Sequence, residues 1–116
     1  MSLTQAREQV AAQLTDLLDG VTVHPHRPNV VRVWDGWLTL RQVGVSTFRT
    51  AEATFEVVIV LGTAEDAAED ALDRFAVGLL DAITSIGGAT PVVPLQLILD
   101  GGGLFCCSAS VVVEIE

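Results

Sequence analysis

Residues 52–61 read EATFEVVIVL, and this stretch decides how the rest of the chain is interpreted. Apolar side chains occupy every second position, as they do along one face of a strand: Ala53, Phe55, Val57, Ile59 and Leu61. The opposite face begins polar at Glu52, Thr54 and Glu56 and becomes apolar at Val58 and Val60. A strand that begins half exposed and ends apolar on both faces is expected at the centre of a sheet.

A long helix is expected directly after this strand. Thr63 and Asp66 have the spacing of a capping box. Apolar residues then recur at helical spacing: Ala68, Leu72, Phe75, Leu79, Ile83 and Ile86. The pair Gly87-Gly88 ends the pattern, so we expect a helix over residues 64–86.

The first turns of this helix are acidic, with carboxylates at Glu65, Asp66, Glu69, Asp70 and Asp73. Acidic side chains there complement the positive end of the helix dipole. Most of them lie opposite the apolar stripe, which is typical of a solvated face and not of a catalytic carboxylate pair.

An N-terminal helix is expected over residues 3–19. Ser2 and Gln5 form a capping box, and Gly20 supplies the stop. One face of the segment is apolar and contains Leu3, Ala6, Val10, Leu14, Leu17 and Leu18.

The region between the two helices contains further strand signals. We expect short strands at residues 21–24 and 30–34, separated by a proline-rich loop over residues 24–28. Asp35-Gly36 is a strong hairpin signal, with residues 37–42 as the return strand. Trp34 and Trp37 would then face each other across the strands, either in the core or as an interface anchor. Residues 44–50 are expected to form a loop or a twisted extension.

Two final strands are expected at residues 92–99 and 104–115, joined through Asp100 and three glycines. The last one alternates cleanly and places on one face Phe105, Cys107, Ala109, Val111, Val113 and Ile115. The expected order is α-β-β-β-β-α-β-β in a single domain, residues 1–116. The expected class is α+β, with two helices packed on one face of a mostly antiparallel sheet.

Composition excludes several classes of protein. The 116 residues are 50% hydrophobic and carry a formal charge of −9, with 15 acidic residues against 6 arginines and no lysine. Disorder, nucleic-acid binding and binding to anionic membranes are disfavoured. The longest aliphatic run covers residues 57–61, whereas a membrane-spanning helix needs about 20 residues. Half-apolar composition in a small domain also suggests self-association.

Candidate chemical groups have simpler structural interpretations. Cys106 and Cys107 are adjacent and are expected as buried thiols in a reducing compartment. His24 and His26 lack a third metal ligand at convincing spacing, and the Gly101–Gly103 run connects two strands. No G-x-S-x-G motif occurs. We therefore expect no enzyme, cofactor or metal site.

The order of segments resembles the small tail terminator proteins of long-tailed bacteriophages, particularly those of actinobacterial hosts. The resemblance covers nearly the whole chain and is carried by residues 2–7 (SLTQAR), 17–20 (LLDG), 24–26 (HPH), 53–62 (ATFEVVIVLG), 64–67 (AEDA), 71–73 (ALD) and 79–83 (LLDAI), followed by a closing hairpin. The hairpin expected over residues 30–42 departs from the Pro- and Gly-rich stretch of that family.

This resemblance implies a structural subunit of the virion tail or neck, assembled in the host cytoplasm. Such subunits form rings, usually hexameric, that cap the head-proximal end of the tail tube, stop its polymerisation and meet the neck proteins. The nearest alternative is a head–tail connector or head-completion subunit, and a less favoured one is a small cytoplasmic ligand-binding domain.

A ring of this kind suggests roles for two sets of residues. The candidate subunit interface comprises Trp34, Trp37, Leu38 and Phe48. The acidic helix face, Glu65 to Asp73, is expected on the surface or lining the lumen, where negative charge lets DNA pass without sticking.

Overall fold

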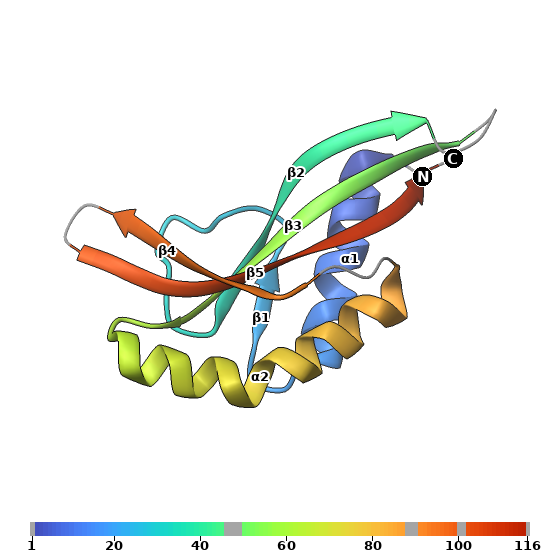
Figure 1. The fold of residues 1–116 in the computed structure, drawn as a ribbon. Coiled ribbons are helices and arrows are strands. Elements are labelled where there is room, and N and C mark those ends of the chain that lie inside the picture. The colour runs from blue at the N-terminus through green and yellow to red at the C-terminus, as the bar shows by residue number, and fades with distance from the viewer. Residues whose placement is uncertain (1, 46–49, 88–90, 100–101, 116) are drawn as a thin grey trace.

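The fold is built around a five-stranded sheet with two helices (Figure 1). A computed structural model describes residues 2–45, 50–87, 91–99 and 102–115. The elements are α1 (Leu3–Leu17), β1 (Thr22–His24), β2 (Asp35–Val45), β3 (Ala51–Gly62), α2 (Glu65–Ile86), β4 (Val93–Leu99) and β5 (Gly102–Ile115). The α+β class is confirmed, with three strands between the helices where four were expected.

The strand β3, which contains residues 52–61, is central in the sheet, as its sequence predicts. The sheet order is β1-β2-β3-β5-β4, so β3 has two strands on each side. The β2–β3, β3–β5 and β4–β5 pairs are antiparallel, whereas the short β1 runs parallel to β2. The sheet is therefore mostly antiparallel, as expected.

The main core lies between the helices and one face of the sheet. The alternating apolar residues of β3 meet those of β5, α1 and α2 there, and its largest fully buried members include Phe55, Leu14, Leu38, Ile59, Leu79 and Ile83. Leu72, Phe75 and Ile86 complete the α2 stripe as partly buried side chains. The two amphipathic patterns and the strand alternation thus describe one shared interior.

The helix caps agree with the sequence at one helix and not at the other. Ser2 Oγ accepts the Gln5 N–H at 3.1 Å, and Gln5 Oε1 accepts the Ser2 N–H at 2.9 Å, which confirms the first capping box. The Thr63/Asp66 box is wrong, because α2 begins after Ala64, which makes no side-chain cap. Instead the Asp66 carboxylate accepts the Ala67 N–H at 2.8 Å and satisfies a donor of the first turn from within the helix.

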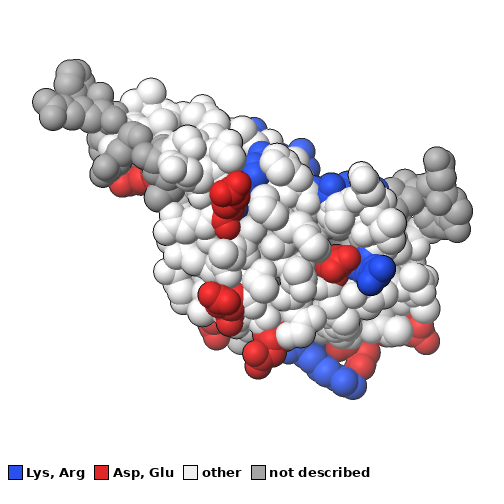
Figure 2. Space-filling view, turned by 180° about the vertical axis from the view of Figure 1, so that it is seen from behind, with Lys and Arg blue, Asp and Glu red and all other residues white. Residues whose placement is uncertain are grey.

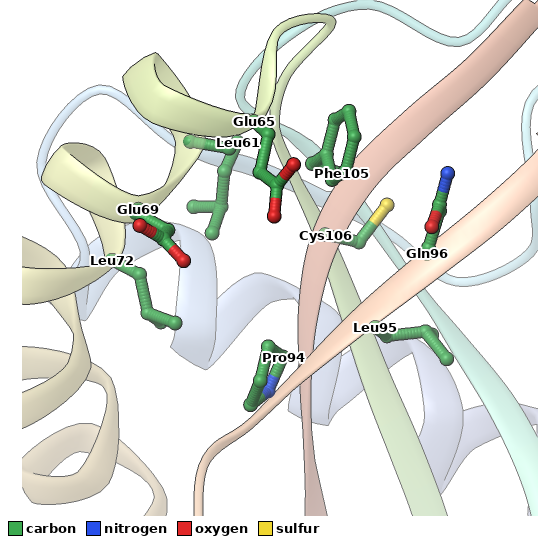
Figure 3. A pocket seen from close by; sticks show the side chains of 10 residues that line it. Leu61, Glu65, Glu69, Leu72, Pro94, Leu95, Gln96, Phe105 and Cys106 are labelled. Carbon is green, nitrogen blue, oxygen red and sulfur yellow. The ribbon is translucent and has the colours of Figure 1, made fainter.

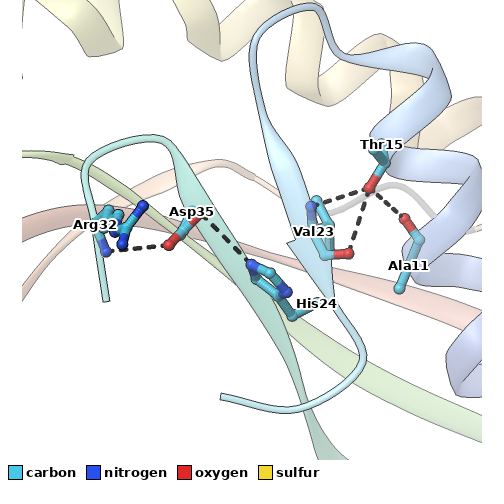
Figure 4. Close-up of polar contacts among 6 residues, drawn as sticks. All are labelled: Ala11, Thr15, Val23, His24, Arg32 and Asp35. Carbon is cyan, nitrogen blue, oxygen red and sulfur yellow. Dashed lines mark hydrogen bonds and ion pairs between the residues drawn. The ribbon is translucent and has the colours of Figure 1, made fainter. Parts of the chain in front are cut away.

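The expected strand at residues 30–34 and the expected Asp35-Gly36 hairpin turn are wrong. Residues 25–34 form the connection between the parallel strands β1 and β2, and β2 already begins at Asp35. The turn comes earlier, closed by the Asp35 N–H donating to Arg32 O at 3.0 Å. Trp34 occupies it with a φ of 69°, in the left-handed region. The Asp35 carboxylate accepts the Arg32 N–H at 3.1 Å and lies 3.5 Å from His24 Nε2 (Figure 4).

Gly36 is needed for close packing, which explains why a turn-forming pair stands inside a strand. It is buried opposite Ile59, and a Cβ at this position would lie 2.9 Å from Ile59 Cγ1 and 3.0 Å from Val58 O. A side chain would therefore push β2 away from the central strand.

Thr15 joins α1 to the short strand β1. Its Oγ1 donates to Ala11 O at 2.9 Å and accepts the Val23 N–H at 3.0 Å (Figure 4). The side chain thus supplies an acceptor for a β1 amide next to the core.

The outer ends of β2 and β3 continue beyond the helical layer as a twisted arm (Figure 1), whereas Val113 and Ile115 near the end of β5 still pack against the main core. The molecule measures 47 × 28 × 21 Å and exposes 6738 Å². A compact monomer of this mass exposes about 6,100 Å², so the arm adds surface. Residues 44 and 45 of the expected loop belong to β2, and residues 46–49 lie outside the described residues. No helix in the described ranges combines the length and apolarity that crossing a bilayer requires.

Candidate functional site

The two tryptophans do not form the expected cross-strand pair. Trp34 lies on the helix side, where its ring meets Phe75 edge-on with centroids 5.4 Å apart. Trp37 belongs to a second apolar cluster on the opposite sheet face. They separate because the chain turns at Trp34 before β2 begins, so the two residues never flank a hairpin.

The four residues expected at a subunit interface have different environments. Trp37 and Leu38 are 4% and 2% exposed, and Leu38 points into the main core. Trp34 is partly buried, and Phe48 lies outside the described residues. Because Leu38 is buried within one chain, it is a core residue of the fold. Contact of any of the four residues with a neighbouring subunit stays a prediction.

The sheet face opposite the helices, here called the open face, carries its own small apolar cluster. Trp37, Val58, Val60 and Cys106 are buried there, with Val31, Leu95, Leu97 and Leu104 packed around them. Both helices pack on the other face, so in the described part of the chain it is the β1–β2 connection, through Val31 and Arg27, that reaches this cluster. Because only this connection covers the open face, the buried ring of Trp37 forms the floor of a hollow in the surface.

That hollow belongs to a groove of about 620 Å³, here called the open-face groove, whose lining also reaches Arg7, Leu38 and Leu40 on the helix side of β2. Its lining comes from four parts of the chain: α1, the β1–β2 connection, the middle strands and β4. The residues are Arg7, His26, Arg27, Trp37, Leu38, Thr39, Leu40, Arg41, Glu56, Val58, Leu95 and Leu97. Three arginines against one glutamate make it a basic site in a protein of formal charge −9.

Each arginine of the groove has a distinct role. Arg7 Nη1 donates to Pro25 O and to Leu38 O, both at 2.9 Å, so it fastens α1 to the connection and to β2. Arg41 pairs with Glu56 through two hydrogen bonds, the shorter of 2.8 Å. The hydrogen bond and charge of that carboxylate raise the pKa of Arg41 above its ordinary value.

Arg27 is the cation of the groove that is free to meet a partner. Its side chain is exposed, and its guanidinium carbon lies 5.5 Å from the centre of the Trp37 ring. Among the described residues no carboxylate pairs with it. A guanidinium held over an aromatic ring keeps its donors for a ligand or a neighbouring protein.

The adjacent cysteines are free and buried, on opposite faces of β5, as their spacing predicts. Burial raises the pKa of Cys106 to about 11, while the charge of Arg27 lowers it in part. Burial, reinforced by Cys106, raises the pKa of Cys107 to about 12. Both thiols are therefore protonated at neutral pH, and nucleophilic chemistry needs the thiolate.

A second pocket, of about 330 Å³, lies between the start of α2 and the strands β4 and β5 (Figure 3). Leu61, Leu72 and Phe105 make it apolar, and Glu65 and Glu69 stand beside it. All five acidic residues of the first α2 turns are exposed, as expected for a solvated face. Whether they line a lumen stays a prediction.

The two histidines are used separately. His24 lies 3.5 Å from Asp35, while His26 is exposed at the open-face groove. Within the described ranges, no three His, Cys, Asp or Glu side chains gather as a metal site requires.

Charge is unevenly spread over the surface. In the view of Figure 2, several blue side chains lie along the upper margin, while the middle and lower parts are mostly red, with blue side chains beside red ones at the right and at the lower edge. In comparisons with known proteins, no family model and no curated protein matches the chain. These comparisons therefore do not indicate a family or a function for it.

Proposed function

We propose that this chain is a ring-forming structural subunit that caps the head-proximal end of a bacteriophage tail tube, stops its polymerisation and joins it to the neck. The resemblance to tail terminator proteins, which spans nearly all residues, supports this role. The proposed partners are further copies of the chain, the tail tube protein and the neck proteins, with DNA passing through the ring. The proposed location is the tail or neck of the virion.

The observation that carries the proposal is that the two faces of the sheet differ. One face is covered by α1 and α2, and the other holds a groove with Trp37 in its floor. A subunit with two unlike surfaces suits a head-to-tail contact, because such contacts close into rings when the rotation between copies allows it.

The arm and the sheet edges are also suited to assembly. β1 pairs with the first three residues of β2, and from Leu38 onward no described strand pairs with that edge. Val43 and Val45 on this part of β2 are 49% and 87% exposed. Exposed strand edges and apolar side chains are features that a monomer avoids and an assembly covers.

Electron microscopy of the protein mixed with tail tubes from the same phage tests the role. Closed rings seated on one end of each tube, with tube growth stopped, are the expected result. Rings that bind the capsid vertex and ignore the tube would favour the connector alternative. Bare tube ends without rings would refute the proposal.

A further inference from the structure

The outward face of α2 is divided into an acidic half and an apolar half. Asp66, Asp70 and Asp73 precede Val77 and Leu80 at alternating spacings of four and three, so they share one side of the helix. This side lies opposite the stripe that packs on the sheet. Val77 is 68% and Leu80 38% exposed, which leaves apolar area without cover in a single chain.

The open-face groove combines a positive part and an apolar part, which match the acidic and apolar halves of the α2 face. Arg27 supplies an exposed cation at one part of it, and Leu95, Leu97 and Val58 supply an apolar wall from the strands. On the helix, Asp70 already pairs with Arg74 at 2.6 Å, so Asp66 and Asp73 are the carboxylates that can meet Arg27, while Val77 and Leu80 can meet the apolar wall. Complementary charge at such a contact favours one orientation and one partner.

The dimensions of the groove also suit a helix. It extends from β2 across β3 to β4, with β5 between the last two. Three strand spacings of about 4.8 Å span about 14 Å, while a helix with its side chains is about 10–12 Å wide. The stripe from Asp66 to Leu80 is about 21 Å long at 1.5 Å per residue, enough to cross both halves of the groove.

We infer that the open-face groove of one copy receives the outward face of α2, Asp66 to Leu80, of a second copy. This inference rests on the proposed ring, for which it supplies the subunit contact. The groove and the helix are different surfaces, so each copy offers one and accepts the other, as a heterologous interface requires. In this arrangement the acidic residues from Asp66 to Asp73 face the neighbouring copy and not the lumen of the ring.

Charge reversal on each surface tests the contact. Arg27→Glu disables the groove and Asp73→Arg disables the helix. We expect each variant to weaken self-association at least about tenfold, measured by sedimentation velocity, because buried charge pairs at interfaces are costly to break. Arg32→Glu and Asp16→Arg make the same charge changes at exposed positions outside both surfaces and should associate like the unaltered protein. Arg27→Gln removes the positive charge without adding a negative one. It tests the same contact if Arg27→Glu does not fold.

Mixing the two disabled variants gives a sharper result. In an equimolar mixture each contact joins one chain of each variant, with either the native charges or both charges reversed, so the mixture should associate although neither variant does so alone. The chain carrying both substitutions restores opposite charges and should recover assembly. Thermal unfolding of each variant checks that the fold is retained.

The results separate the contact from the proposed function. Unaltered protein that stays monomeric, variants that associate normally, or a mixture that stays monomeric would each overturn the contact. Rings that cap tubes but ignore both substitutions would overturn the contact, leave the function standing and favour the lumenal placement of the acids. Assembly that depends on Arg27 and Asp73 without capping any tube would support the contact and refute the function.

Discussion

Replacing Trp37 by alanine is expected to destabilise the folded chain by about 3–5 kcal/mol, the cost of truncating a buried aromatic side chain. Trp37 is 4% exposed and packs with Val58, Val60 and Cys106 beneath the open-face groove. It also holds the guanidinium of Arg27, a contact that contributes about 0.5–1 kcal/mol at an exposed site. The substitution would leave a void that the paired strands cannot close.

The size of the effect relative to total stability makes it measurable. Domains of this length unfold with about 5–15 kcal/mol, so the variant loses a large fraction of its stability. An unfolding entropy of about 2.1 cal/mol/K per residue gives about 0.24 kcal/mol/K for this chain, and the melting temperature should fall by about 12–20 °C.

Urea unfolding followed by circular dichroism measures the difference without relying on tryptophan fluorescence. Val45→Ala, on the same strand and 87% exposed, is the matched control and should change stability by less than about 0.5 kcal/mol. A loss below about 1 kcal/mol for Trp37→Ala, combined with loss of self-association, would show that Trp37 acts at an interface and would refute the core assignment.

Three further outcomes can be checked by the same unfolding assay. Trp34→Gly should be about 1 kcal/mol more stable than Trp34→Ala, because φ is 69° there and glycine tolerates it; equal stabilities would contradict this. Thr15→Val should cost about 1–3 kcal/mol by leaving the Val23 N–H without its acceptor, whereas Thr15→Ser should cost less. The raised pKa values of Cys106 and Cys107, about 11 and about 12 against an ordinary 9.0, mean that the unfolded chain loses those protons first. The free energy of unfolding should therefore fall as pH rises above about 9, and the double alanine variant should flatten that fall.

The elements predicted correctly are those whose patterns are local and long. The alternation in β3 and β5 and the helical stripe in α2 each repeat several times, so a single exception does not change the assignment. Because β3 is apolar on both faces at its end, its sequence also predicts its central place in the sheet. The capping box at Ser2 succeeded since both partners lie within one turn.

The errors fall where distant parts of the chain decide the local structure. Asp35-Gly36 has the composition of a hairpin turn, but the close approach of Ile59 explains the glycine and the turn at Arg32 explains the aspartate. The parallel pairing of β1 with β2 is non-local and leaves no periodic signal. A tryptophan with positive φ is rare, so no sequence rule would place the turn there.

The open-face groove could be predicted only in part. Trp37, Thr39 and Arg41 alternate along β2, and this period of two was available as a sign of a shared face. Arg27 and Leu95 come from the β1–β2 connection and from β4, and the folded sheet is what brings them together. The acidic face of α2 was visible from the sequence, whereas its proposed partner surface was not.

Cryo-electron microscopy of the protein assembled on tail tubes tests the ring most directly. We predict a closed ring at one tube end, with α2 of each subunit lying in the open-face groove of the next. Tubes with bare ends, beside protein that remains monomeric, would contradict it.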